Sequence, residues 1–201
     1  MSASKILLIL VAIVALVVVV GGVAVSGTYN GLVQLDQSTQ AAWANVQTAY
    51  QRRLDLIPNL VATVKGAAKF EQDTLTAVTE ARAKVGQINA AGLAENPAAL
   101  KRFEEAQAGL GSALSRLMVV AEQYPELKAT QNFRDLQVSL EQTENRIGVE
   151  RRRFNEAAQA FNTKRDSFPT VLIAGFFGSK FQPKAYFAAD PAASKAPEVK
   201  L

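Results

Sequence analysis

The sequence contains no cysteine and no histidine among its 201 residues. Without cysteine the chain cannot form a disulfide, a thiolate metal site or a thiol nucleophile. Without histidine it lacks the commonest general base and zinc ligand, and every Ser-His or Cys-His arrangement. A metal site would need oxygen ligands only, and no loop has the EF-hand pattern. We therefore predict no cofactor and no metal.

The net charge of +4 does not come from the body of the chain. Residues 28–168 contain nearly equal numbers of basic and acidic side chains, and the surplus comes from Lys5 and from the segment after residue 168. A protein that follows a phosphate backbone needs a continuous basic face. We therefore expect no nucleic-acid partner.

The longest apolar run is Ile6 to Val25, twenty residues without a charged or polar side chain. At about 1.5 Å per residue it would cross the roughly 30 Å hydrocarbon core of a bilayer. The alternative is a cleaved signal peptide, but the run exceeds the roughly 7–15 residues of a signal h-region. We predict that residues 1–27 are an uncleaved membrane anchor, with the lipid bilayer as partner.

The flanking charges predict an orientation for this single-pass anchor. Lys5 and the α-amine precede the apolar run, and the first basic residue after it is Arg52. The positive-inside rule then keeps the N-terminus in the cytoplasm and places the body outside the bacterial cell membrane. A cytoplasmic body stays open as the alternative.

Beyond residue 28 the apolar residues recur at spacings of three and four, which is typical of helices that pack as coiled coils. Asp55 is a plausible N-cap, and Pro58 is best tolerated in the first turn of a helix. We predict an all-α protein in which residues 28–168 form an up-down-up-down four-helix bundle. The expected helices are about 28–54, 56–90, 97–124 and 129–168. Separate coiled-coil helices in an oligomer are the alternative, and the short predicted turns favour closure within one chain.

Four polar residues interrupt the apolar seams near the middle of the predicted bundle: Thr39, Glu71, Gln107 and Thr143. Counting from each turn at about 1.5 Å per residue places them at one height. We predict a buried polar layer in which Gln107 and the threonines donate hydrogen bonds to Glu71. Gln107→Leu alone should then destabilise the bundle. The same counting predicts an ion pair between Arg82 and Glu150.

The segment 169–187 combines aromatic residues with lysines. In the predicted topology its start lies beside residue 28, next to the bilayer. Such a mixture suits the headgroup region of a bilayer. We therefore predict that five side chains contact the membrane: Phe176, Phe177, Lys180, Phe181 and Lys184. The alternative is that the aromatic residues fold back and plug the open end of the bundle. Residues 188–201 are expected to be disordered.

Two further patterns have ordinary structural explanations. The acidic pairs Glu104-Glu105 and Glu141-Glu144 could in principle support acid-base chemistry, but solvated positions and structural ion pairs produce the same pattern. Residues 151–153 are three arginines that fan around one helix, which favours pairing with neighbouring helices over binding one anion.

Gly22 and Ser26 form a small-xxx-small step that could pair two spans.

Several strings resemble the LemA family over roughly residues 28–187. The most specific are DLIPNLV at 55–61 and TENRI at 143–147, and further matches are at 29–33, 42–43, 124–128 and 152–155. The resemblance implies an N-terminal membrane segment, a four-helix bundle and no established enzymatic activity. For many members the resemblance implies a body inside the cell, opposite to the charge-based expectation. Relatives with a lipoprotein cysteine before the Tyr-Asn pair, where this chain has Thr28, imply an exported body instead.

These observations predict a non-catalytic, membrane-anchored scaffold that binds an unidentified membrane or envelope protein. The alternative is a membrane-organising protein that acts through its aromatic segment and forms a homo-oligomer. An enzyme with a carboxylate-based site is the third and weakest hypothesis.

Overall fold

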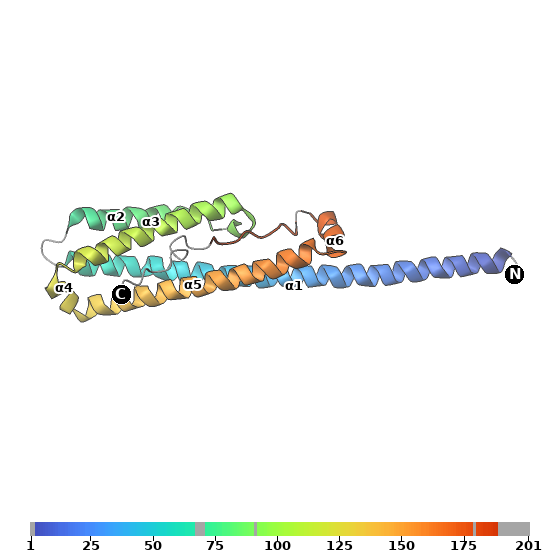
Figure 1. The fold of residues 1–201 in the computed structure, drawn as a ribbon, viewed down its shortest axis with the longest axis horizontal. Coiled ribbons are helices and arrows are strands. Elements are labelled where there is room, and N and C mark those ends of the chain that lie inside the picture. The colour runs from blue at the N-terminus through green and yellow to red at the C-terminus, as the bar shows by residue number, and fades with distance from the viewer. Residues whose placement is uncertain (1–2, 67–70, 91, 179, 189–201) are drawn as a thin grey trace, which may run out of the picture.

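The computed structural model describes residues 3–66, 71–90, 92–178 and 180–188, and these residues form helices and no strand (Figure 1). The all-α prediction is confirmed. The elements, in order, are α1 (Ala3–Lys65), α2 (Gln72–Gly86), the 3₁₀ turn η1 (Leu93–Glu95), α3 (Pro97–Ala121), α4 (Pro125–Ala129), α5 (Gln131–Asp166) and α6 (Thr170–Phe176).

Helix α1 is one continuous helix of 63 residues, so the predicted boundary between helices 28–54 and 56–90 is wrong, and Asp55 is not an N-cap. Pro58 lies inside it and has no N–H to donate to the carbonyl of Leu54, four residues earlier. Arg82 on α2 donates its Nε–H to that carbonyl at 3.1 Å. This side chain replaces the missing helical hydrogen bond, and the helix therefore continues through the proline.

The other predicted boundaries shift accordingly. Residues 56–65 belong to α1, so the predicted helix 56–90 is reduced to α2, which has only 15 residues. Helix α3 begins at Pro97, where Asn96 Oδ1 accepts the N–H of Ala99 at 3.0 Å. The predicted helix 129–168 corresponds to α5, whose N-cap is Thr130.

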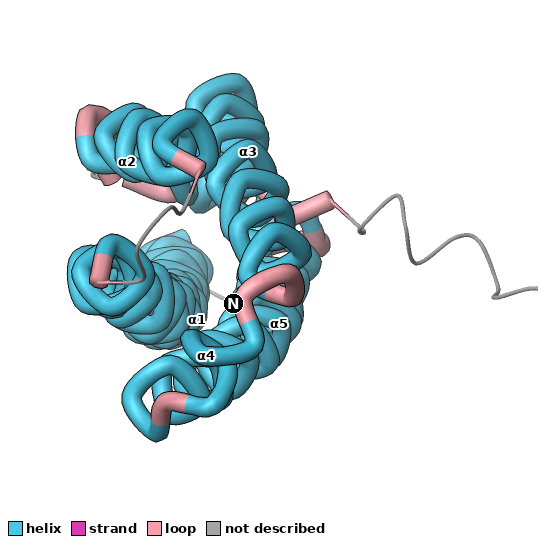
Figure 2. The backbone as a smooth tube through the Cα atoms, turned by 90° about the vertical axis from the view of Figure 1, so that its left-hand side faces the viewer, coloured by secondary structure: helices cyan, strands magenta, loops and turns pink. Residues whose placement is uncertain are grey.

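The bundle has two layers, α1 with α5 and α2 with α3 (Figures 1 and 2). The seam positions expected from the sequence form its core, and each large side chain contributes roughly 1.5–3 kcal/mol on full burial. Fully buried examples are Leu32, Leu60, Val64, Leu110, Leu117, Phe154 and Phe161. Because α2 is much shorter than α5, the upper layer covers only part of the lower one (Figure 1).

The first third of α1 extends away from the bundle (Figure 1). Its large apolar side chains from Leu7 to Val25 are 46–69% exposed, and the segment is long and apolar enough to cross a membrane. Burial within the protein begins directly after it, at Thr28 and Tyr29. The apolar segment is therefore the candidate membrane anchor, and we call the end of the bundle beside it, near residue 28, the membrane end.

Candidate functional site at the membrane end of the bundle

Helix α6 lies against α1 and α5 at the membrane end (Figure 1). Thr170 and Ala174 are buried against the bundle, and the Phe177 ring lies 5.0 Å from that of Tyr29 on α1. The opposite side of this segment exposes a group of apolar side chains, which we call the collar. Its residues are Phe168 (82% exposed), Val171 (40%), Leu172 (66%) and Phe176 (84%). The collar thus presents apolar surface where α1 leaves its apolar segment.

After the collar the chain turns back along α5 as an extended segment, residues 180–188, which we call the strap (Figure 1). Asn162 of α5 binds the main chain of Lys184 twice: Oδ1 accepts its N–H at 2.8 Å, and Nδ2 donates to its carbonyl at 2.9 Å. Asn155 binds Phe187 in the same way, at 2.9 and 3.0 Å. Seven residues separate the two asparagines, which places them on one face of α5.

The other side of the strap contacts η1 and α3. The Ala185 N–H donates to the Ala94 carbonyl at 2.7 Å, and the Ala188 N–H donates to Glu104 Oε1 at 3.1 Å. Arg151 bridges the two sides, because it donates to Glu104 at 2.7 Å and to the Ala188 carbonyl at 3.0 Å. The strap therefore fills the part of the upper layer that the short α2 leaves open.

Lys184 is the charged anchor of the strap and is only 5% exposed. Its Nζ lies 2.6 Å from Asp36 of α1 and 2.7 Å from Glu95 of η1, and 5.0 Å from the centre of the Phe161 ring. The second oxygen of Asp36 accepts a hydrogen bond from Gln40 at 2.7 Å. A buried ammonium group is stable only with such partners. Two carboxylates from separate elements therefore define a pocket for a cation.

Phe187 is the apolar anchor and is 4% exposed. Its ring stacks on Trp43 at a centroid distance of 5.8 Å and meets Phe154 edge to face at 5.5 Å. The Arg151 guanidinium lies 4.7 Å above the same ring. Trp43 also contacts Phe103. This aromatic cluster joins the strap to the main core of the bundle.

The residues predicted to contact the membrane thus divide into two groups. Phe176 belongs to the collar, Phe177 is partly exposed beside Tyr29, and Lys180 contacts the Tyr29 hydroxyl and ring. Phe181 is fully buried and Lys184 nearly so, which corrects their assignment to the interface. The physical reason is that the fold offers these two side chains ring contacts and carboxylates inside the protein. Phe181 and Lys184 follow the alternative, in which this segment folds back onto the end of the bundle. Membrane contact is a hypothesis for the collar only.

The predicted polar layer does not form, because Glu71 is exposed. It is the N-cap residue of α2 and accepts the Thr74 hydroxyl at 2.9 Å. Thr39 donates to the carbonyls of Leu35 and Ala157, and Thr143 to that of Ser139 at 2.7 Å. The height count failed because α1 continues to Lys65, which moves the start of the next helix to residue 72.

Gln107 is buried, as predicted, but none of the expected partners reaches it. It is 4% exposed and lines a cleft of about 650 Å³ between α1 and the end of α2. Its Oε1 and Nε2 are both buried, and neither has a hydrogen-bond partner among the residues that the structure describes. An unpaired buried amide destabilises the fold.

The predicted Arg82–Glu150 ion pair is also wrong. Arg82 is engaged by the Leu54 carbonyl, as described above. Glu150 is fully buried, and its Oε1 lies 2.7 Å from Arg146 and 3.1 Å from Arg153, both on its own helix. Both local partners bind Oε1, whereas Oε2 is buried and has no hydrogen-bond partner among the described residues.

One carboxylate of each acidic pair forms an ion pair with another helix, and the other members, Glu105 and Glu141, are exposed. Glu144 lies 3.2 Å from Arg53 on α1, and Glu104 pairs with Arg151 from α5, which is the kind of pairing predicted for residues 151–153. Burial raises the pKa of the Glu104 carboxyl, and the Arg151 charge opposes that shift. Burial also raises the pKa of the Tyr50 hydroxyl to about 12. Both groups belong to the packing around the strap and the core.

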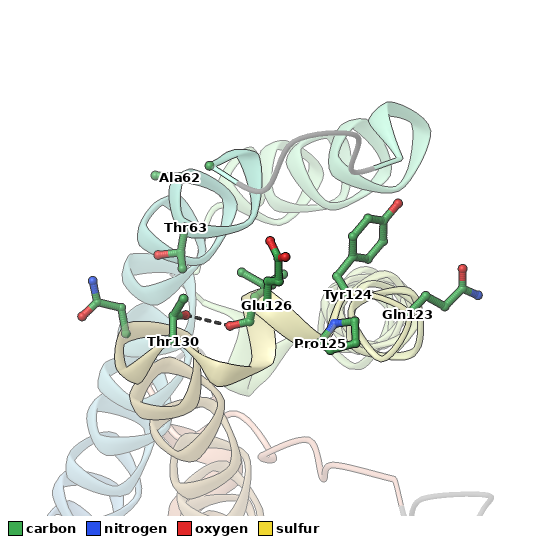
Figure 3. Close-up of a pocket in the computed structure, with 10 residues that line it drawn as sticks. Ala62, Thr63, Gln123, Tyr124, Pro125, Glu126 and Thr130 are labelled. Atoms are coloured by element: carbon green, nitrogen blue, oxygen red, sulfur yellow. Dashed lines mark hydrogen bonds between the residues drawn. The ribbon is translucent and has the colours of Figure 1, made fainter.

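A second hollow lies at the opposite end of the bundle, between the end of α1 and the turn from α3 through α4 to α5 (Figure 3). It has a volume of about 960 Å³. Glu126 is the one carboxylate among the described residues that line it, and Thr130 donates to the Leu127 carbonyl at 2.7 Å (Figure 3). A single carboxylate does not make an acid-base pair. We call this hollow the distal pocket.

The protein is a helical bundle built on a long N-terminal helix that contains a candidate membrane span. A family model described as the LemA family matches residues 42–201, and the chain belongs to this family. Two proteins of Paramagnetospirillum magneticum named magnetosome protein MamQ 1 and MamQ 2 are each 30% identical in an alignment of 181 residues that covers 82% of this chain. Protein LemA of Metamycoplasma hominis is 28% identical over 148 residues, 74% of this chain. The chain spans 66% of the length of the MamQ proteins and 64% of that LemA protein.

Proposed function

We propose that the protein is a non-catalytic, membrane-anchored helical scaffold that binds a protein partner at the bacterial cell membrane. The observation that carries this proposal is the continuity of α1, which runs from the exposed apolar segment into the buried core without a break. A helix of 63 residues is about 95 Å long. A bundle built on such a helix is held at a fixed height and angle to the membrane.

Partner binding is supported by the arrangement of the exposed surfaces. The collar, around α6, lies at the membrane end of the bundle (Figure 1). The distal pocket lies at the opposite end (Figure 3). Of the acidic groups that could have supported catalysis, Glu144 is paired with Arg53 and Glu104 with Arg151. A rigid body with these features is suited to present surface to another protein.

Site-specific photo-crosslinking in cells tests this proposal. A photoreactive residue is placed at exposed Glu126 beside the distal pocket, and a matched control at Val138 on the side of α5. A scaffold gives discrete heterologous bands, identified by mass spectrometry, that depend on the position of the probe. The same faint background from every exposed position would contradict partner binding.

The second candidate is a membrane-organising protein that acts through the collar and through self-association. The exposed apolar side chains of the collar favour it, and so do relatives named magnetosome proteins. The Gly22 and Ser26 step in the candidate span offers a surface for pairing. In the same crosslinking experiment this function would give self-ladders and lipid adducts from collar positions.

We further propose that the body lies outside the cytoplasm, because Lys5 precedes the span and no Lys or Arg follows it before Arg52. Protease added to intact spheroplasts should then digest the bundle. Protection until the membrane is lysed would place the body in the cytoplasm.

A further inference from the structure

The strap is bound in the manner of a peptide ligand. Its main chain adds no strand or helix to the fold, and the side chains of Asn155 and Asn162 bind both the donor and the acceptor of one residue each. Side-chain amides that pair with a main chain recognise any extended segment, whatever its sequence. The spacing of seven residues on α5 corresponds to the three-residue step from Lys184 to Phe187, since both cover about 10 Å.

Two pockets add sequence preference to this main-chain recognition. Asp36 and Glu95 surround the ammonium group of Lys184, and the Trp43 and Phe154 rings enclose that of Phe187. The surface formed by these side chains and the two asparagines is called the strap groove. It fits an extended segment of the pattern Lys-x-x-Phe.

We propose that the strap groove is a peptide-recognition site that exchanges occupants, and that the strap of a second copy of this chain can enter it in place of the protein's own. The second copy is the occupant whose complementarity is already visible, because its strap has the same residues at the same spacing. Exchange of an identical element between protomers is a low-cost route to association.

Anchoring favours this exchange. Copies with a common anchor stand in one membrane in one orientation, so each groove and each strap lie at the same height above the bilayer. Confinement to a surface also raises the effective concentration of one copy near another. The inference uses the anchor of the proposed scaffold but does not require its heterologous partner.

A complementation experiment with two tagged full-length copies tests the exchange. The receptor copy has an intact groove and a disabled strap, with Lys184→Ala and Phe187→Ala. The donor copy has an intact strap and a disabled groove, with Asn155→Ala and Asn162→Ala. The control pair carries the disabled strap in both copies. The candidate span and the collar are unchanged throughout, so association through them is equal in both pairs.

An absence in the sequence supplies a second readout. The chain has no cysteine, so Ala94→Cys in the receptor and Ala185→Cys in the donor form a disulfide between copies only when a strap enters the other groove. Both cysteines in one otherwise unaltered chain give the internal reference disulfide. Where that reference does not form, co-purification of the two tags decides alone. Circular dichroism checks that the variants keep their helices, and Asn155→Ala and Phe187→Ala alone replace the double changes where they do not.

We expect the complementing pair to co-purify several-fold above the control pair and to form the disulfide between residues 94 and 185. Co-purification at the control level, with no disulfide between copies, would overturn the exchange. A disulfide from Ala94→Cys to a different protein, and none to the second copy, would overturn the second copy as the occupant. If the exchange fails but the photo-crosslinking experiment still gives position-dependent bands with other proteins, the proposed scaffold function stands without the exchange.

Discussion

The side-chain amide of Asn155 forms two hydrogen bonds with the main chain of Phe187, accepting its N–H at 2.9 Å and donating to its carbonyl at 3.0 Å. This pair connects the end of the strap to α5 and holds the Phe187 ring against Trp43. Trp43 is the one tryptophan in the chain, so its fluorescence reports on this contact.

Asn155→Ala removes both hydrogen bonds and should release this end of the strap. We expect a red shift of the Trp43 emission and a loss of about 1–3 kcal/mol in the free energy of unfolding, since two main-chain groups lose their partners. Urea unfolding followed by fluorescence measures both quantities. Asn59→Ala at an exposed site on α1 is the matched control. Equal behaviour of the two variants would contradict the importance of the pair.

The collar and the strap should respond differently to the same substitution. Phe176→Ser, at a site 84% exposed, should change the free energy of unfolding by less than about 0.5 kcal/mol. Phe181→Ser, at a fully buried site, should lower it by about 3–5 kcal/mol. Thermal unfolding of the full chain in nanodiscs compares them. Similar losses would contradict the division of the aromatic residues into two groups.

Contact of the collar with lipid has its own measurement. A fluorophore attached at Phe176→Cys in the otherwise cysteine-free chain should be quenched by spin-labelled lipids in a nanodisc. The same fluorophore at Val138→Cys, an exposed apolar site on α5, should not be quenched. Absence of quenching at residue 176 would show that the collar faces water or another protein.

Gln107→Leu should stabilise the protein by about 1–2 kcal/mol, because it replaces an amide whose two polar atoms are buried and have no partner in the described part of the chain. The sign is opposite to the one that the predicted polar layer required. Gln123→Leu, at an exposed site near the distal end, serves as the control. Chemical unfolding of the two variants decides the sign, and a clear loss of stability at residue 107 would indicate that the amide is paired.

The buried hydroxyl of Tyr50 should make the free energy of unfolding depend on pH in the alkaline range. Burial raises the pKa of its hydroxyl from 10.0 to about 12, so the unfolded chain loses this proton at a lower pH than the folded chain. The associated stability is fully present below pH 10 and should be lost between about pH 10 and 12, by roughly 2–3 kcal/mol. Tyr50→Phe should not show this loss of stability, although its other titrating groups are the same as in the unaltered protein. Parallel stability curves for the two proteins over that range would rule the effect out.

The sequence by itself determined the elements that depend on local periodicity. The apolar run Ile6 to Val25 and the three-four spacing of the seams are features that neighbouring residues create. The candidate span, the all-α class and most of the core positions were therefore predictable. The seven-residue spacing of Asn155 and Asn162 can be read from the sequence, but it predicted nothing, because their partners Phe187 and Lys184 lie 32 and 22 residues further along the chain.

Tertiary structure decided what depends on groups far apart in the sequence. Pro58 lies inside a continuous helix because Arg82, 24 residues later, supplies the hydrogen bond that the proline removes. That continuity shortened α2, removed Glu71 from the core and opened the space that the strap fills. Lys184 is buried rather than exposed because Asp36 and Glu95, on two other elements, meet at its ammonium group. Burial of a charge depends on the partners that the fold assembles, which spacing along one segment does not specify.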